Sequence, residues 1–296
     1  MFSAKKEFRM PFKIFSDGTA NLSGEYLKNV TLLPCNYRDE TNEYVYNGVL
    51  EDFDFKSFYD SIRAGKQYKT SLINTEEFKS YFTPVLREGF DVIYISMASG
   101  ISGTCQAANL AAEELREEFP DRVIRIIDSR TCGMGSGLQV IRAAELLQQG
   151  KEAAEAADIM ESEVQHYCSY FTVDNLMNLV RTGRVSKAVA VAAGVLDIKP
   201  ILFGSMDAKI VNCGKCRGRK KSMMMLAAKF KEKAVDISDH IVAISHGDCL
   251  ADAETLAGMI RAIGEPRQIL ILPHEPFSGG HVGPGMLGLF FWGETR

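Results

Sequence analysis

The sequence lacks a long hydrophobic run, a strong excess of one charge and a leader-like start, and each absence excludes a class of protein. The longest apolar stretch near its end, MLGLFFW (286–292), is far shorter than the roughly 20 residues that a membrane-spanning helix needs. The formal charge of -4 provides no general attraction to nucleic acid or to an anionic membrane surface. MFSAKKEFRM carries charges with no apolar run behind them, so we expect no secretory signal.

The number of cysteines is odd, so they cannot all pair in disulfides within one chain. Seven cysteines in 296 residues favour reduced thiols, and so a cytoplasmic protein, over a disulfide framework. With 46% hydrophobic and 24% charged residues, the composition is that of a soluble globular protein rather than a disordered one. At roughly 150 residues per domain, the length favours two domains.

The first half of the chain alternates apolar β-branched runs with amphipathic segments. This alternation predicts a parallel sheet with helices on both faces. The predicted strands are a short one opening KIFSDGTANL (13–22), then 30–37, 92–96 and 123–128. A helix is predicted to begin shortly after Asp17. The other predicted helices are 54–65, 70–89, one that begins at about Thr104 and one that ends at Gly150.

The second half also mixes strands and helices. The predicted strands are 169–173, 199–204, 208–215, 240–247 and 268–275. The predicted helices are 152–165, 188–196, a long one entered through RGRKKS, and 251–263. We place a soft domain boundary near residue 160, which gives an N-terminal α/β domain (1–160) and a C-terminal α/β domain (161–296).

The turn SGISGTCQAA (99–108) joins a predicted strand to a predicted helix and concentrates the hydroxyl groups of this region. A phosphate-binding loop would need a lysine after its last glycine, but Thr104 and Cys105 follow Gly103. The glycines of GMGSG (133–137) have the wrong spacing for a dinucleotide site.

A nucleophile is the second interpretation of this turn. The hydrolase elbow is G-x-S-x-G, whereas the sequence Gly100-Ile101-Ser102-Gly103 is one residue too short. A pair of Ser102 with His281 could still form in space, so an acyl-ester or acyl-phosphate hydrolase that uses these two residues is the alternative hypothesis.

A carboxylate site is the third interpretation, and it fits the residue types best. A helix N-terminus presents free N–H groups and partial positive charge. The hydroxyls of Ser99, Ser102 and Thr104 add neutral donors, and without a lysine or arginine the turn suits one negative charge better than three. The plainer alternative is that these serines only cap the helix.

Seven segments together carry a resemblance to a known family: TSLIN, ASGISGTCQAA, IIDS, GRVS, IKPIL, KCRGRKK and GGHVGPGMLG, in this order. The sequence resembles the DegV family of bacterial fatty-acid-binding proteins from about residue 16 to about 288. The resemblance implies two α/β domains, the first with a parallel sheet flanked by helices and the second with a mixed sheet. It also implies that a long-chain fatty acid lies in the cleft between them, with its carboxylate presented to a fatty acid kinase that makes acyl phosphate for phospholipid synthesis.

Residue by residue, the resemblance implies carboxylate binding by Thr70, Ser102 and His281. We expect a supporting pocket formed by Ser71, Ser99, Gly103 and Thr104. Two motifs depart from the usual family forms: T-S-Q-P-S is here Thr70-Ser71-Leu72-Ile73-Asn74, and H-T-G-P-G is here His281-Val282-Gly283-Pro284-Gly285.

Other chemistry-bearing residues are weaker candidates. Cys213 and Cys216 form a lone C-x-x-C, which supports only a third hypothesis, a zinc or redox protein. His246 and His274, with Asp248 and Glu275 near them, lack close metal-ligand spacing, so we expect no metal there. The resemblance to a fatty acid carrier implies no cofactor and no catalytic residue of the chain's own.

Four further positions have assigned roles. Cations are disfavoured at a helix start, so the basic run from Arg217, together with the resemblance, makes Arg184 and Arg217 candidates for docking an acidic partner or its nucleotide. Asp17 is interpreted as a turn former. Asp128 ends a strand at the edge where ligands of α/β folds bind, and is expected to support the pocket.

Overall fold

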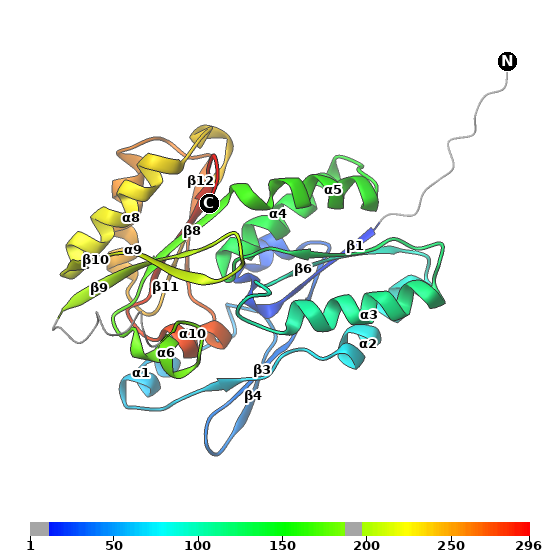
Figure 1. Cartoon of the computed structure of the whole chain (residues 1–296), viewed down its shortest axis with the longest axis horizontal. Coiled ribbons are helices and arrows are strands. Elements are labelled where there is room, and N and C mark those ends of the chain that lie inside the picture. The colour runs from blue at the N-terminus through cyan, green and yellow to red at the C-terminus, as the bar shows by residue number, and fades with distance from the viewer. Residues whose placement is uncertain (1–11, 187–196) are drawn as a thin grey trace.

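The computed structural model describes residues 12–186 and 197–296, which form three sheets with helices packed around them (Figure 1). The first sheet has the strand order β2-β1-β6-β7, the second is a small β4-β3-β5 sheet, and the third has the order β10-β9-β8-β13-β11-β12. The predicted α/β class is confirmed, with a parallel first sheet and a mixed third sheet.

The first sheet consists of β1 (Phe12–Asp17), β2 (Val30–Leu33), β6 (Asp91–Ser96) and β7 (Ile124–Asp128), all parallel. On one side α2 (Thr75–Arg87) and α3 (Thr104–Glu118) pack against it, and on the other α4 (Met134–Gln148) and α5 (Ala153–Glu163). The carboxyl ends of β1, β6 and β7 therefore meet at one edge, where the turns into α3 and α4 begin.

The segment predicted as one strand over 30–37 is two strands in different sheets. β2 ends at Leu33, and β3 (Cys35–Arg38) pairs instead with β4 (Glu43–Tyr46) and β5 (Lys69–Thr70). Pro34 lies between them, and proline has no N–H for a ladder hydrogen bond, so the chain leaves the first sheet there.

Two predicted helix starts also differ from the structure. The segment after Asp17 forms only a short 3-10 helix, Gly18–Ala20, capped by the Asp17 side chain. The helix predicted from residue 70 begins at Thr75, because Asn74 and Glu77 form a capping box and Thr70 belongs to β5. Helix α1 (Phe55–Arg63) lies within its predicted range.

The third sheet is mixed and contains a strand that the sequence analysis missed. Its strands are β8 (Tyr167–Thr172), β9 (Ile198–Gly204), β10 (Ile210–Arg217), β11 (Ile241–His246), β12 (Gln268–Pro273) and β13 (Leu287–Trp292). Missed from the sequence, β13 lies between β8 and β11, antiparallel to both. Helices α8 (Arg219–Lys233) and α9 (Leu250–Arg261) cover one face.

Helix α4 joins the first and third sheets into one continuous core. It contacts β1 and β6 on one side and β8, β11 and β13 on the other. One hydrophobic cluster accordingly includes Ile14 and Ile93 of the first sheet with Ala243 and Phe290 of the third. The division at residue 160, which falls within α5, stays a prediction.

Two short helices complete the fold. These are α6 (Met177–Arg181) and α10 (Pro276–Val282), which contact each other beside α1 (Figure 1). The predicted helix 188–196 lies outside the described residues. Within 12–186 and 197–296, no helix combines the length and the apolar character needed to cross a membrane.

Candidate functional site

The serine-rich turn lies where the sequence analysis expected it, between β6 and α3 at the carboxyl edge of the first sheet. Ser102 Oγ and Thr104 Oγ1 are 2.9 Å apart and share a hydrogen bond, and the Thr104 N–H donates to Ser102 Oγ at 3.3 Å. Gly103, at the cap position, has no side chain to occupy the following N–H groups. The start of α3 is therefore open to an acceptor.

Ser99 is held by Asp128 at the end of β7. Its Oγ donates to Asp128 Oδ2 at 2.6 Å and its N–H to Asp128 Oδ1 at 3.2 Å. The aspartate thus fixes the beginning of the turn, while the Ser99 hydroxyl is already used within the protein.

Gly100 brings this turn against the third sheet. A Cβ atom at this glycine would lie 2.5 Å from the carbonyl oxygen of Ala208, in the β9–β10 connection. Only glycine permits so close an approach of two backbones. The turn is consequently covered by a segment from the other half of the chain.

Thr70 and His281 lie together although 211 positions separate them in the sequence. Thr70 Oγ1, at the end of β5, is 3.0 Å from His281 Nε2, near the end of α10. His281 is only 7% exposed, and among the described residues its Nδ1 has no hydrogen-bond partner. Burial, and then the charges of Arg184 and Arg181, lower the pKa of His281 to about 3, so the imidazole is neutral at ordinary pH.

The segment after Thr70 contacts the serine turn. A Cβ atom at Gly103 would lie 3.1 Å from Leu72 Cδ2. Ser71 is exposed, and its N–H donates to the carbonyl of Asn36 in β3. The structure therefore brings the segments of Thr70 and Ser102 together and bonds Thr70 to His281.

An apolar cavity begins beside these polar residues and runs between the two large sheets. It holds about 480 Å³ of empty space when the open solvent at its mouth is included. Ile101 and Val282, the chain neighbours of Ser102 and His281, both line it. Other apolar side chains along it are Phe171, Ile210, Met286 and Phe290.

A buried chain of polar residues lies behind the cavity, and sequence analysis identified only part of it. His274 Nδ1 is 3.1 Å from Ser245 Oγ, and its Nε2 is 2.8 Å from Ser278 Oγ. Glu275 caps α10 by accepting from the Ser278 N–H at 3.0 Å and from the Ser278 hydroxyl. The missed members are Ser245 and Ser278. Ser278 is four residues after His274, a spacing typical of side-chain pairs on one helical turn.

Burial determines which of these hydrogen-bonded side chains are ionised. It raises the pKa of Glu275 to about 7, with a smaller contribution from the charge of Asp17. It lowers the pKa of His274 to about 3. The imidazole is therefore neutral, and the carboxyl group titrates near neutral pH.

The residues weighed as metal ligands have other partners. His246 Nδ1 accepts from the Cys249 N–H at 3.3 Å, and His274 is held by the two serines. Cys213 and Cys216 are free thiols that donate to the carbonyls of Ile201 and Lys199 in β9. Over 12–186 and 197–296, no three His, Cys, Asp or Glu side chains are grouped to hold a metal ion.

The two arginines considered for partner docking differ in their surroundings. Arg184 is half-buried, it donates to the carbonyl of Thr182, and its charge reaches His281. Arg217 is exposed at the end of β10. Neither forms an ion pair with an acid in the part of the chain that the structure describes. Arg184 is therefore the one with an electrostatic link to the candidate site.

Comparisons with known proteins show the family of the chain. The model of the family described as "Uncharacterised protein, DegV family" matches residues 11–294. A DegV domain-containing protein of Clostridium perfringens is 36% identical over 289 residues, which cover 96% of this chain and 98% of the relative. Among solved structures, a Thermotoga maritima protein that reveals a fatty acid binding function is 26% identical, with a TM-score of 0.83 over 96% of this chain and 99% of its own.

A second solved structure shares the fold at lower identity. The Streptococcus pneumoniae Fatty Acid Kinase (Fak) B3 protein loaded with linoleic acid has a TM-score of 0.83 and is 20% identical. The match covers 96% of this chain and all of that protein. The family model and the Clostridium relative both extend over nearly the full length. The chain belongs to the DegV family.

Proposed function

We propose that this protein binds a long-chain fatty acid, with the acyl chain in the apolar cavity and the carboxylate at its polar mouth. Thr70, Ser102 and His281 hold the carboxylate in this proposal, and Ser71, Ser99, Gly103 and Thr104 shape the pocket around it. The observation that carries the proposal is that Ile101 and Val282, the chain neighbours of Ser102 and His281, both line the apolar cavity, while Thr70 contacts His281. The fatty acid binding of the Thermotoga relative supports it.

The energetics suit a reversible carrier. Burying about fifteen methylenes at about 0.8 kcal/mol each gives a gross gain near 12 kcal/mol. Association and ordering costs offset much of this gain. The carboxylate is the costly end, because it leaves water and needs hydrogen bonds there. A threonine hydroxyl, a serine hydroxyl and the open start of α3 supply such donors without a buried cation.

We further propose that the carboxylate is presented to a fatty acid kinase for acyl-phosphate formation in phospholipid synthesis, so that the chain itself is not catalytic. Arg184, half-buried beside His281, and exposed Arg217 would dock the partner. The Streptococcus kinase-system protein of the same fold supports this step. Charge reversal at Arg217 should then weaken kinase-dependent phosphorylation while fatty acid binding persists.

The experiment that tests the proposal is mass spectrometry of the purified chain. Native spectra should show a bound fatty acid, and denaturation should release it. Thr70→Val and Ser102→Ala should each weaken oleate binding about 10- to 150-fold, since each removes a hydrogen bond to a charged group. Ser80→Ala, an exposed serine on α2, should bind like the unaltered chain. A delipidated chain that fails to rebind oleate would contradict the proposal.

The hydrolase alternative has less support in the geometry. His281 Nε2 contacts Thr70, whereas the Ser102 hydroxyl contacts Thr104. In a serine hydrolase the imidazole contacts the nucleophile and a third group orients its other nitrogen. No described residue does so for Nδ1. Turnover of a chromogenic acyl ester that disappears in Ser102→Ala would favour this alternative.

A further inference from the structure

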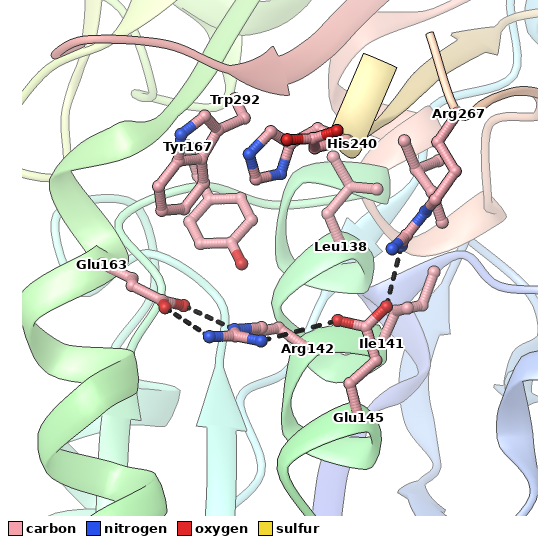
Figure 2. Close-up of a pocket in the computed structure, with 11 residues that line it drawn as sticks. Leu138, Ile141, Arg142, Glu145, Glu163, Tyr167, His240, Arg267 and Trp292 are labelled. Atoms are coloured by element: carbon pink, nitrogen blue, oxygen red, sulfur yellow. Dashed lines mark hydrogen bonds and ion pairs between the residues drawn. The ribbon is translucent and has the colours of Figure 1, made fainter. Parts of the chain in front are cut away.

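A second pocket, of a different character, lies against the carboxyl-terminal half of α4 (Figure 2). It holds about 660 Å³ of empty space, its open mouth included. Leu138 and Ile141 of α4 and Ile241 of β11 give it apolar walls. It lies at the start of β8 and β11 and the end of β13, and none of its lining residues belongs to the apolar cavity described above.

The arginines of this pocket are already paired with carboxylates. Arg142 donates from Nε and Nη2 to the two oxygens of Glu163, at 2.8 and 2.7 Å. Its Nη1 is 3.7 Å from Glu145, which also accepts from Arg267 at 2.7 Å (Figure 2). An anionic ligand would have to compete with these ion pairs. Asp239 adds a third carboxylate against two guanidinium groups, so the lining has one negative charge in excess.

The pocket contains two polar side chains that the protein leaves unpaired. Tyr167 is only 7% exposed, and its hydroxyl points into the pocket toward the Arg142 ion pair in Figure 2. His240, whose pKa is lowered by burial and by Arg267, presents a neutral imidazole. Among residues 12–186 and 197–296, neither the Tyr167 hydroxyl nor the His240 ring has a hydrogen-bond partner. The Tyr167 hydroxyl faces the open pocket, where it is available to hydrogen-bond a ligand.

The aromatic wall is held rigid. Trp292 is stacked between the rings of His166 and His240, with centroids 4.8 and 4.7 Å away, and Tyr167 packs edge-on against it at 5.2 Å. Side chains fixed in this way hold the Tyr167 hydroxyl in one place, so a ligand finds it preorganised.

We propose that this pocket binds a small organic cation, a protonated primary amine joined to a short apolar or aromatic group. The amine meets the one negative charge that Asp239 adds to the two ion-paired glutamates, and it donates to the Tyr167 hydroxyl. The apolar part lies on Leu138 and Ile141. This site is separate from the proposed fatty acid site and is tested separately.

Trp292 is the only tryptophan of the chain and lines the pocket, so its fluorescence reports on binding. The full-length protein is titrated with phenethylamine, with neutral 2-phenylethanol and with anionic 3-phenylpropionate, each with and without excess oleate. We expect phenethylamine to change the fluorescence saturably whether or not oleate is present. The alcohol should bind at least fivefold and the acid at least tenfold more weakly.

Two variants sharpen the result. Tyr167→Phe keeps the ring and should weaken phenethylamine binding about 2- to 10-fold, the equivalent of one hydrogen bond. Glu163→Gln removes the excess negative charge and should abolish the preference for amine over alcohol. Tyr81→Phe, on α2 at the first sheet, is the matched control and should change nothing.

Several outcomes would overturn the proposal. These are no saturable response to the amine, equal or tighter binding of the acid, loss of the amine response when oleate is added, or unchanged affinity in Tyr167→Phe. Fatty acid release on denaturation is measured independently, so failure here leaves the proposed carrier function standing, and failure there leaves this pocket standing.

Discussion

The two pockets lie along one face of the third sheet but present opposite environments. Ser169 of β8 and Phe290 of β13 line the apolar cavity, while two residues away on the same strands Tyr167 and Trp292 line the charged pocket. Alternate residues of a strand share a face. One face of the sheet can therefore line an apolar cavity and an ion-paired pocket side by side, with the residues that line them only two positions apart on the same strand.

Helix α4 contributes to the difference between the two pockets, because it has small residues near its start and long charged residues two turns later. Near its start, a Cβ atom at Gly135 would lie 2.8 Å from Phe290, so small residues let the helix approach the cavity closely. Two turns later Arg142 and Glu145 point from the same helix into the charged pocket. The same helix thus approaches the cavity-lining Phe290 through a glycine and lines the charged pocket with long side chains.

The largest expected effect comes from the apolar side. Phe290→Ala removes a side chain that is 4% exposed and that packs in the core shared by both sheets. We expect the free energy of unfolding to fall by about 3–5 kcal/mol, measured by urea titration. Met177→Ala, at a position that is 52% exposed, should change it by less than about 0.5 kcal/mol. A similar small loss for Phe290→Ala would mean that the cavity wall is not part of the tight core.

The next effect depends on pH and distinguishes the buried carboxyl group of Glu275 from the carboxylates that are held in ion pairs. The folded chain raises the pKa of Glu275 to about 7 from an ordinary 4.5. The protonated Glu275 carboxyl group therefore stabilises the folded chain at acidic pH. This stabilisation is lost as pH rises through 7, because the carboxyl group ionises more readily in the unfolded chain. Glutamine cannot ionise, so the stability of Glu275→Gln relative to the unaltered chain should rise between pH 5 and pH 8, by about 2–3 kcal/mol.

Urea titrations of both proteins at the two pH values measure this change. Glu76→Gln, at an exposed position on α2, should show no such pH dependence. The acid-side losses from neutral His274 and His281 occur in both proteins and cancel in the comparison. A flat difference between pH 5 and pH 8 would show that Glu275 keeps one ionisation state throughout.

The smallest effect is expected from the ion pairs. Arg142→Met leaves the partly buried Glu163 carboxylate without its bidentate partner, and we expect a loss of about 1–2 kcal/mol, reduced in 1 M NaCl. Lys56→Met breaks an exposed pair with Asp60 and should cost less than about 0.5 kcal/mol. Equal effects of the two variants would mean that the charged pocket is fully solvated.

The sequence predicted most strands of both large sheets, because their central residues are buried and β-branched. It missed β13, since LGLFFW is almost wholly buried and so shows no period of two, and the run resembles any other short apolar segment. It also joined β2 to β3, although Pro34 between them was a visible signal for the break.

The candidate site was only partly within reach of the sequence. The motifs that resemble the DegV family identified Thr70, Ser102 and His281, and their role in carboxylate binding stays a prediction. The hydrogen bond between Thr70 and His281 depends on how β5 meets α10, which no local pattern records. Tyr167 and Trp292 belong to strands that meet only in the folded sheet, so their shared pocket was likewise invisible.

Gly100 also bears on how fast a ligand would enter and leave the proposed fatty acid site. Because its bare backbone touches the carbonyl of Ala208, the serine turn and the β9–β10 connection obstruct each other's movement. A fatty acid that entered the proposed site beside this contact would have to displace both segments, which lie about a hundred residues apart in the sequence. Replacing Gly100 by alanine would wedge them open, and the speed of entry and exit would rise before affinity changed.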